Sequence, residues 1–106
     1  MYIHTYTGPR RFTWDARKSS ENFAARGFDY AFAARVFEGL TLEREDTRRD
    51  YGERRVIAIG IVEGIALTVV YTDRTATAGH VVRRIISARV ASRRERRIYE
   101  EAIQTP

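Results

Sequence analysis

The sequence contains no cysteine, and this absence excludes several kinds of chemistry. Disulfide bonds, thiolate nucleophiles and cysteine-ligated zinc cannot form. Long apolar runs are absent as well, because no stretch approaches the roughly 20 residues that span a bilayer. The N-terminus also lacks the apolar core of a signal peptide. We therefore expect a protein without membrane segments that works in the reducing cytoplasm.

Lysine is almost absent, since Lys18 is one of 19 cationic side chains and the other 18 are arginine. The net charge of +5 is concentrated near the C-terminus. Residues 1–80 carry 12 basic and 11 acidic side chains, whereas residues 81–106 carry 7 arginines and 3 acids. This local excess of positive charge indicates an anionic partner, either a nucleic acid or the acidic surface of another protein.

Side chains that bind metals or titrate near neutral pH are scarce. His4 and His80 lie far apart in the sequence, and we expect each of them at a surface or loop position. The central acids Asp46, Asp50 and Glu53 do not have the spacing of a known metal-binding loop. The sequence therefore predicts no metal site and no cofactor.

The N-terminal half carries two helix start signals. At 106 residues and 43% apolar content, the chain should form a single domain over residues 1–106. Residues 12–14 predict a short strand, after which Asp15 caps a helix that runs to about Ala25 and stops at Gly27. A second, short helix between Asp29 and Gly39 should follow, with an apolar stripe formed by Phe32, Ala33, Val36 and Phe37.

The periodicity changes from helical to extended at Leu40. Residues 40–43 alternate and predict a strand with one solvated face, and residues 44–52 are polar and turn-like. Two β-branched runs, Val56–Val62 and Ile65–Tyr71, are separated by Glu-Gly, which predicts an antiparallel hairpin.

The C-terminal part predicts one more strand and one more helix. After a loop over residues 73–80, residues 81–87 form an apolar run that suits a buried strand. Ser92 with Glu95 three residues later is a capping box, which starts a helix that ends near Ala102. The expected fold is α+β, a small antiparallel sheet with two N-terminal helices and one C-terminal helix.

Several segments of the chain occur together in one known family. In order, they are FTWDARKSSENFAARG, VFE, YGERRVIAIG, YTDR and RIISARVASRRERRIY. With this combination, over roughly residues 12–100, the chain resembles the BrnT toxin family. The resemblance implies a RelE-like fold and a bacterial type II toxin that cleaves RNA and blocks translation. It also implies a ribbon-helix-helix antitoxin as partner, two toxins and two antitoxins per assembly, and contact with operator DNA only through that complex.

RNA cleavage without a metal needs a proton acceptor, a proton donor and cations that stabilise charge on the phosphate. Arg89, at the corner between the last strand and the last helix, can hold a phosphate with two hydrogen bonds. The predicted catalytic residues are Arg89, Arg55 and Glu38, with Glu38 transferring protons. The predicted substrate-binding residues are Arg84, Arg26, Lys18 and Arg74. Because side chains alternate along a strand, only one of the adjacent Arg54 and Arg55 can join the site.

Several of these residues also have ordinary structural interpretations. Glu38 suits a solvated helix end, and Lys18 suits an ion pair with Asp15 or Glu21. Trp14 can belong to the core or stack on a base, and Tyr99 can pack inward or present its phenol in a cleft.

One short segment departs from the family pattern. Family members typically have Lys-His-Gly where this chain has Ala25-Arg26-Gly27, and that lysine is associated with toxicity. Ala25 can do no chemistry, while Arg26 keeps a positive charge at the adjacent position. An alternative function is therefore a non-catalytic or attenuated binding module that holds an antitoxin and contributes to operon autoregulation.

Overall fold

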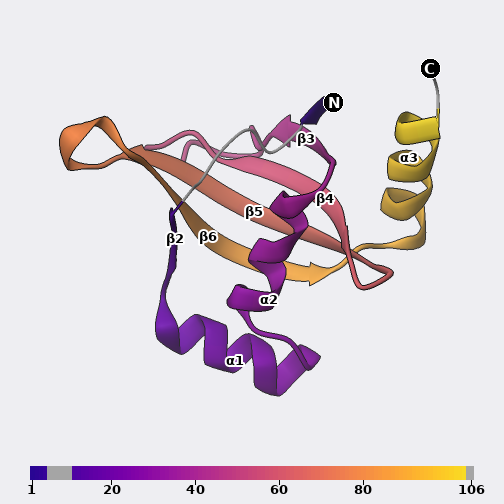
Figure 1. Ribbon diagram of the computed structural model, residues 1–106, viewed down its shortest axis with the longest axis horizontal. Coiled ribbons are helices and arrows are strands. Elements are labelled where there is room, and N and C mark those ends of the chain that lie inside the picture. The colour runs from indigo at the N-terminus through magenta and orange to yellow at the C-terminus, as the bar shows by residue number, and fades with distance from the viewer. Residues whose placement is uncertain (5–10, 105–106) are drawn as a thin grey trace.

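The computed structural model describes residues 1–4 and 11–104 as a six-stranded sheet with helices on both faces (Figure 1). The strands are β1 (Tyr2–His4), β2 (Arg11–Trp14), β3 (Thr41–Glu45), β4 (Val56–Val62), β5 (Ile65–Thr75) and β6 (Val81–Val90). The helices are α1 (Ala16–Arg26), α2 (Tyr30–Ala34) and α3 (Arg93–Gln104), with short 3₁₀ turns η1 (Arg35–Glu38) and η2 (Thr77–Gly79). Within the described ranges, no helix is long and apolar enough to span a membrane.

The α+β class is confirmed, but the predicted all-antiparallel sheet is wrong. The strand order is β1-β3-β4-β5-β6-β2, and the edge strand β2 runs parallel to β6, with Trp14 opposite Ile85. The predicted strand over residues 12–14 is confirmed as β2, whereas β1 was not predicted, and α1 and α2 connect the edge strand β2 to β3 on the opposite side of the sheet rather than beginning the fold. The alternation of apolar and polar residues along a strand predicts which face of the sheet each side chain occupies. It does not predict which other strand lies beside it. The parallel pair therefore had no sequence signal.

The predicted helix caps are confirmed at both helices of the N-terminal half. The Asp15 carboxylate accepts a hydrogen bond from the Lys18 backbone N–H at 3.0 Å, and Gly27 ends α1 with φ of 85°. Only a residue that tolerates this left-handed conformation can end the helix in this way. The Asp29 carboxylate accepts from the Phe32 backbone N–H at 2.8 Å and starts α2.

The sheet has a hydrophobic core on each face. On the face covered by α2, here called the α2 face, the core includes Val36 and Phe37 of η1 and Leu67, Val69 and Tyr71 of β5. On the opposite α3 face, a smaller core joins Leu42, Ile59 and Tyr99, and the Tyr99 hydroxyl donates to the Leu40 carbonyl at 2.9 Å. Tyr99 therefore packs inward. In Figure 1, α2 lies across β5 and β6, whereas α3 stands at one end of the sheet.

The prediction of a solvated face on β3 is wrong. Thr41, Leu42 and Glu43 are all buried, and the side chain of Glu43 is fully enclosed. The Thr41 hydroxyl donates to Glu43 at 2.6 Å and the Tyr71 hydroxyl donates to its other carboxylate oxygen. Because β1 pairs outside β3, this strand is internal rather than an edge, and its polar side chains are satisfied inside the protein.

The central hairpin is confirmed, with both turn residues, Glu63 (φ 49°) and Gly64 (φ 78°), in the left-handed region that a two-residue hairpin turn requires. Its second strand and the last strand are longer than predicted. β5 continues to Thr75, so the predicted loop over residues 73–80 is wrong for its first part, and β6 continues to Val90. Arg89 therefore lies inside the sheet ladder, opposite Thr68, rather than in a turn.

Candidate nucleic-acid interface

The orientation of Arg84 follows from its two neighbours on β6. Arg83 is buried against the rings of Phe37 and Tyr71, and Ile85 belongs to the α2 core. Successive side chains of a strand point to opposite faces. Arg84, half-buried between these two inward residues, therefore points to the α3 face.

Three arginines follow one another along β5 and β6 on the α3 face. Arg84 lies opposite Thr72, Arg89 lies opposite Thr68, and Arg74 is two residues beyond Thr72 on the same strand. We refer to Arg74, Arg84 and Arg89 as the arginine row. Six residues of β5 separate its ends, and a strand rises about 3.3 Å per residue, so the row is about 20 Å long. This length suits several consecutive phosphates of an extended single strand.

At one end of this row the sheet and α3 enclose a polar cavity of about 220 Å³. Its lining comprises Arg44, Arg48, Ile57, Thr68, Val70, Ser87, Arg89 and Glu95. Arg89 donates from Nη1 and Nη2 to the two carboxylate oxygens of Glu95, at 2.6 and 2.9 Å. The hydrogen bonds from Arg89 lower the pKa of Glu95 to about 2, so this carboxylate is charged over the physiological range.

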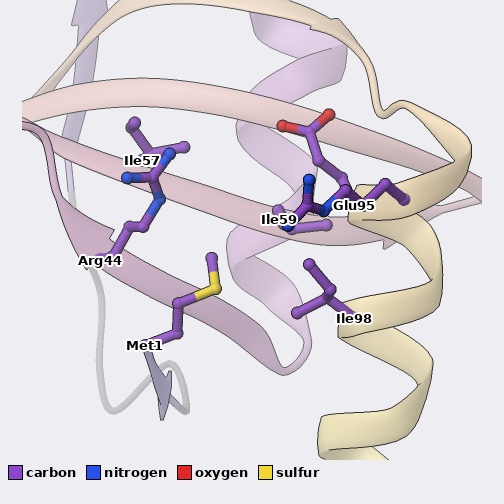
Figure 2. A pocket seen from close by; sticks show the side chains of 7 residues that line it. Met1, Arg44, Ile57, Ile59, Glu95 and Ile98 are labelled. Atoms are coloured by element: carbon purple, nitrogen blue, oxygen red, sulfur yellow. The ribbon is translucent and has the colours of Figure 1, made fainter.

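A second pocket, of about 350 Å³, lies beside this cavity and shares Arg44, Ile57 and Glu95 with it. Figure 2 shows Arg44 of β3 at one side of the pocket and Glu95 and Ile98 of α3 at the other, with Met1 at the lower edge of the view. The pocket is apolar inside and charged at its rim. It therefore offers an apolar surface directly next to a cluster of cations.

Arg48 is held in place by the loop that follows β3. Its Nε and Nη2 atoms donate to the two oxygens of Asp46, both at 2.8 Å, and the Tyr51 hydroxyl donates to the same carboxylate at 3.0 Å. The side chain of Asp46 is 1% exposed. The hydrogen bonds from Arg48 hold the pKa of Asp46 well below its ordinary value. This buried carboxylate fixes the direction of a guanidinium that lines the cavity.

Arg55 and Arg74, two of the predicted site residues, meet at one carboxylate. Arg55 Nε lies 3.1 Å and Arg74 Nη2 lies 3.0 Å from carboxylate oxygens of Glu53. Both contacts lower the pKa of Glu53, and the contact with Arg74 has the larger effect. The Arg55 guanidinium also stacks 4.1 Å from the centre of the Tyr51 ring. Arg54 instead pairs with Glu45. The structure thus brings Arg55 to the Arg74 end of the arginine row.

Glu38 does not join these arginines. It is exposed at the end of η1, where it lies 4.0 Å from Arg35 and borders a shallow pocket with Phe12 and Trp14. Phe12, Trp14 and η1 pack on the α2 face. The sheet therefore separates Glu38 from Arg89, and the two side chains cannot contact one phosphate together.

The basic residues of α1 are also apart from the cavity. Arg26 is exposed and its Nη1 donates to the Asn22 side chain at 2.9 Å. Lys18 is exposed at the start of α1, and Arg17 rather than Lys18 forms the ion pair with Glu21. The pKa of Asp15 is lowered chiefly by the Lys18 backbone N–H and also by the nearby charge of Arg84. Thr13 lies opposite Arg84 in the β2–β6 ladder, so the N-terminus of α1 lies beside the arginine row.

Three residues that line the cavity, Arg44, Arg48 and Glu95, are not among the predicted site residues. Arg44 and Arg48 belong to residues 44–52, for which the sequence predicts a polar turn, but β3 continues to Glu45 and its alternation gives Arg44 the same face as Leu42. Glu95 was recognised as a helix cap, and this is confirmed by hydrogen bonds between its side chain and the Ser92 N–H and between its own N–H and Ser92 Oγ. Its contact with Arg89 had no local signal, because residues six apart meet only through the bend between β6 and α3.

The fold and site together define a small α+β domain with a row of cations on one sheet face, and no group of metal-ligating side chains exists among residues 1–4 and 11–104. Such a face suits an anionic polymer. A family model described as the ribonuclease toxin, BrnT, of type II toxin-antitoxin systems matches residues 14–95. The chain therefore belongs to the BrnT family, as its motifs predict, and is a ribonuclease toxin whose family acts on RNA and pairs with an antitoxin protein. No curated protein matches it significantly.

Proposed function

We propose that this protein is an endoribonuclease that needs no metal ion and that blocks translation by cutting RNA in the cytoplasm. The observation that carries this proposal is the arginine row, with the Arg44, Arg48 and Arg89 cavity at its end. Cationic groups in fixed directions stabilise the charge that develops on a phosphate during cleavage. The buried carboxylate of Asp46 holds Arg48 in this way, and Glu95 keeps Arg89 at the cavity in the free protein.

The reaction we propose is attack of a ribose 2′-hydroxyl on the adjacent phosphate. A bond forms between the 2′-oxygen and phosphorus as the 2′-hydroxyl gives its proton to a carboxylate, the bond to the 5′-oxygen breaks, and the 5′-oxygen takes a proton from solvent water. Arg89 and Arg84 stabilise the reacting phosphate, while Arg55 and Arg74 bind neighbouring nucleotides of the same RNA strand. Glu53 and Glu95 contact these arginines, whereas Glu38 lies on the other face, so either is better placed than Glu38 to accept the 2′-hydroxyl proton once the RNA phosphates replace the arginine contacts that lower its pKa.

Incubation of the purified protein with RNA in excess chelator tests this function. We expect cleavage by the wild type and a loss of about 10²–10³-fold in Arg89→Ala, the range for removing one charge-stabilising donor. Arg89→Lys keeps the ion pair with Glu95 but loses the two-pronged contact, and should also be impaired. Arg96→Ala, which removes a solvent-exposed guanidinium paired with Glu100, is the matched control. Absence of cleavage, or cleavage only after adding a divalent metal, would contradict the proposal.

For the partner, we propose an antitoxin with a ribbon-helix-helix DNA-binding region. In the proposed assembly, two toxins and two antitoxins form a heterotetramer, and this chain reaches operator DNA only through the complex. The matched family supports an antitoxin as such. Co-expression with the neighbouring gene, followed by mass measurement of the purified complex, tests the stoichiometry.

A second candidate function is that of an attenuated module that mainly binds the antitoxin. Two features favour it: Ala25 stands where the resemblance to the family implies a lysine, and an apolar groove of about 410 Å³ borders Arg26. In that groove Phe23, Ile65 and Val90 are 60%, 44% and 55% exposed. Exposed apolar surface of this kind marks binding sites. Wild-type protein that binds the antitoxin but cuts no RNA would establish this second function.

A further inference from the structure

The carboxylate of Glu95 occupies the arginine-lined cavity in the way that a bound phosphate would. Both of its oxygens accept hydrogen bonds from Arg89, in the two-pronged arrangement that arginine also forms with phosphate. The side chain of Glu95 is 22% exposed, so solvent still reaches the cavity from outside. An anion from solution can therefore compete for the same guanidinium.

The cavity holds more hydrogen-bond donors than Glu95 uses. Thr68 is 3% exposed, and its hydroxyl makes no hydrogen bond of normal geometry within the described ranges, although a weaker interaction with the Glu95 carboxylate helps to lower the pKa of Glu95. Arg44 makes no ion pair with any described residue. Arg48 uses Nε and Nη2 for Asp46, which leaves Nη1 unused among the described contacts.

A tetrahedral phosphate can use these donors better than a planar carboxylate can. A buried hydroxyl without a partner costs roughly 1–3 kcal/mol, and native proteins retain few such groups. A phosphate has oxygens for Arg89 and further oxygens for Thr68 and for Arg44 or Arg48. The unsatisfied Thr68 hydroxyl is thus explained if the usual occupant of the cavity is a larger oxyanion than Glu95.

We propose that this cavity is a phosphate-binding subsite for RNA, and that Glu95 holds the place of the phosphate until the substrate displaces it. The proposal rests on the proposed ribonuclease function. It adds the position at which one RNA phosphate binds and identifies Glu95 as the carboxylate that competes with that phosphate. On exchange, Arg89 turns from Glu95 to the phosphate, and Glu95 keeps its hydrogen bond with the Ser92 N–H at 2.8 Å. Glu95 therefore lowers the affinity of the empty subsite for all anions, and only a ligand with additional contacts displaces it.

Glu95→Gln tests this exchange without removing the helix cap. Glutamine serves in a capping box as well as glutamate does, so the variant should fold with α3 intact. It loses the charge that competes for Arg89. Glu100→Gln is the matched control, because Glu100 lies on the same helix and pairs with the solvent-exposed Arg96 at 2.9 Å.

The probe is a short single-stranded DNA oligonucleotide, which has phosphates but no 2′-hydroxyl and so cannot be cleaved by the proposed reaction. We expect Glu95→Gln to bind it about 10-fold more tightly than the wild type, with a steeper dependence on salt because one more cation is available. Glu100→Gln should change the affinity less than about 2-fold, as expected of a screened surface charge. Unchanged or weaker binding by Glu95→Gln would overturn the proposal.

Thr68→Val provides a second, independent variant. Valine has nearly the shape of threonine and removes only a hydroxyl that makes no hydrogen bond of normal geometry, so the midpoint of denaturant unfolding should change little. The affinity of the Glu95→Gln background for the oligonucleotide should fall about 3- to 10-fold when Thr68→Val is added. Unchanged affinity would show that the hydroxyl does not face the ligand and would overturn the assigned subsite.

These binding outcomes are separate from those of the cleavage test. If the wild type fails to cut RNA in chelator while Glu95→Gln still gains affinity, the ribonuclease mechanism is wrong and the phosphate subsite stands. If the wild type cuts RNA and Glu95→Gln gains no affinity, the mechanism stands and the subsite is wrong.

Discussion

The guanidinium of Arg83 lies 3.8 Å from the centre of the Tyr71 ring, and the hydroxyl of that tyrosine donates to the enclosed carboxylate of Glu43. Arg83 is 3% exposed and also makes two hydrogen bonds with Asp73, at 2.7 and 2.8 Å. Three strands, β3, β5 and β6, are thereby joined beneath η1. A cation over an aromatic ring is stabilised most where water is excluded. The neighbouring Arg84, on the opposite face, is held in direction by this buried network.

Replacement of Arg83 should therefore destabilise the whole domain. We expect Arg83→Met to lower the free energy of unfolding by about 2–4 kcal/mol, because the ion pair and the ring contact are lost together. Denaturant unfolding measures this change. Arg97→Ala, at an exposed position of α3, should change stability by less than about 0.5 kcal/mol. A similarly small change in Arg83→Met would show that the network contributes little.

A second prediction concerns the close contact between β4 and η1. A Cβ atom at Gly60 would lie 2.8 Å from Val36 Cβ and 3.2 Å from Thr41 Cγ2, and both neighbours are buried. We expect Gly60→Ala to lower the free energy of unfolding by about 1–3 kcal/mol through overpacking.

Gly39→Ala is the control for this contact, because no atom lies within 4 Å of its built Cβ and its φ of −124° suits any residue. Equal unfolding midpoints for the two variants would contradict the packing of η1 on the sheet.

A third prediction concerns acid stability. The pKa of Glu95 is lowered in the folded protein from 4.5 to about 2 by Arg89. A group whose folded pKa is lowered stabilises the protein above its unfolded pKa, and this stabilisation is lost as the pH falls through the folded value. The free energy of unfolding should therefore decline between about pH 4.5 and 2, and less steeply in Glu95→Gln.

The difference between the two proteins isolates Glu95, since Asp46, whose pKa is also lowered, is present in both. Parallel stability curves over this range would mean that the contact with Arg89 is weak in solution.

A fourth prediction separates the two faces of the sheet. Glu38→Gln should retain RNA cleavage within about 2-fold of the wild type, because Glu38 lies on the α2 face and the arginine row lies on the other. A general base contributes about 10²–10⁴-fold to a rate, so the alternative outcome is easily distinguished. A loss of that size in Glu38→Gln would restore Glu38 as the proton-transfer group.

The local features of this fold were predictable from sequence, whereas the long-range ones were not. Asp15, Asp29 and Ser92 are caps whose partners lie within three residues, and the Glu63-Gly64 turn needs only its own backbone preferences. The parallel pairing of β2 with β6 depends on contacts some 70 residues apart, to which alternation is insensitive.

The candidate site was predictable to the same degree. Arg84, Arg89, Arg55 and Arg74 were identified from charge and family motifs, and the structure places them on or beside one sheet face. Arg48 was missed because its position depends on the loop after β3 and on the buried Asp46, whereas Arg44 was missed because β3 extends further than predicted. The sequence predicts Glu38 as the proton-transfer group. Its separation from Arg89 by the sheet becomes apparent only in the structure.

The most direct test of a 2′-hydroxyl attack on a phosphate held by arginines is to identify the ends of the RNA products formed in excess chelator. Attack by the 2′-hydroxyl leaves a 2′,3′-cyclic phosphate on one fragment and a 5′-hydroxyl on the other, and we predict these ends. They should disappear when the cleaved nucleotide carries a 2′-deoxyribose. Products with a 3′-hydroxyl and a 5′-phosphate, or cleavage of the deoxy-substituted strand, would contradict the account.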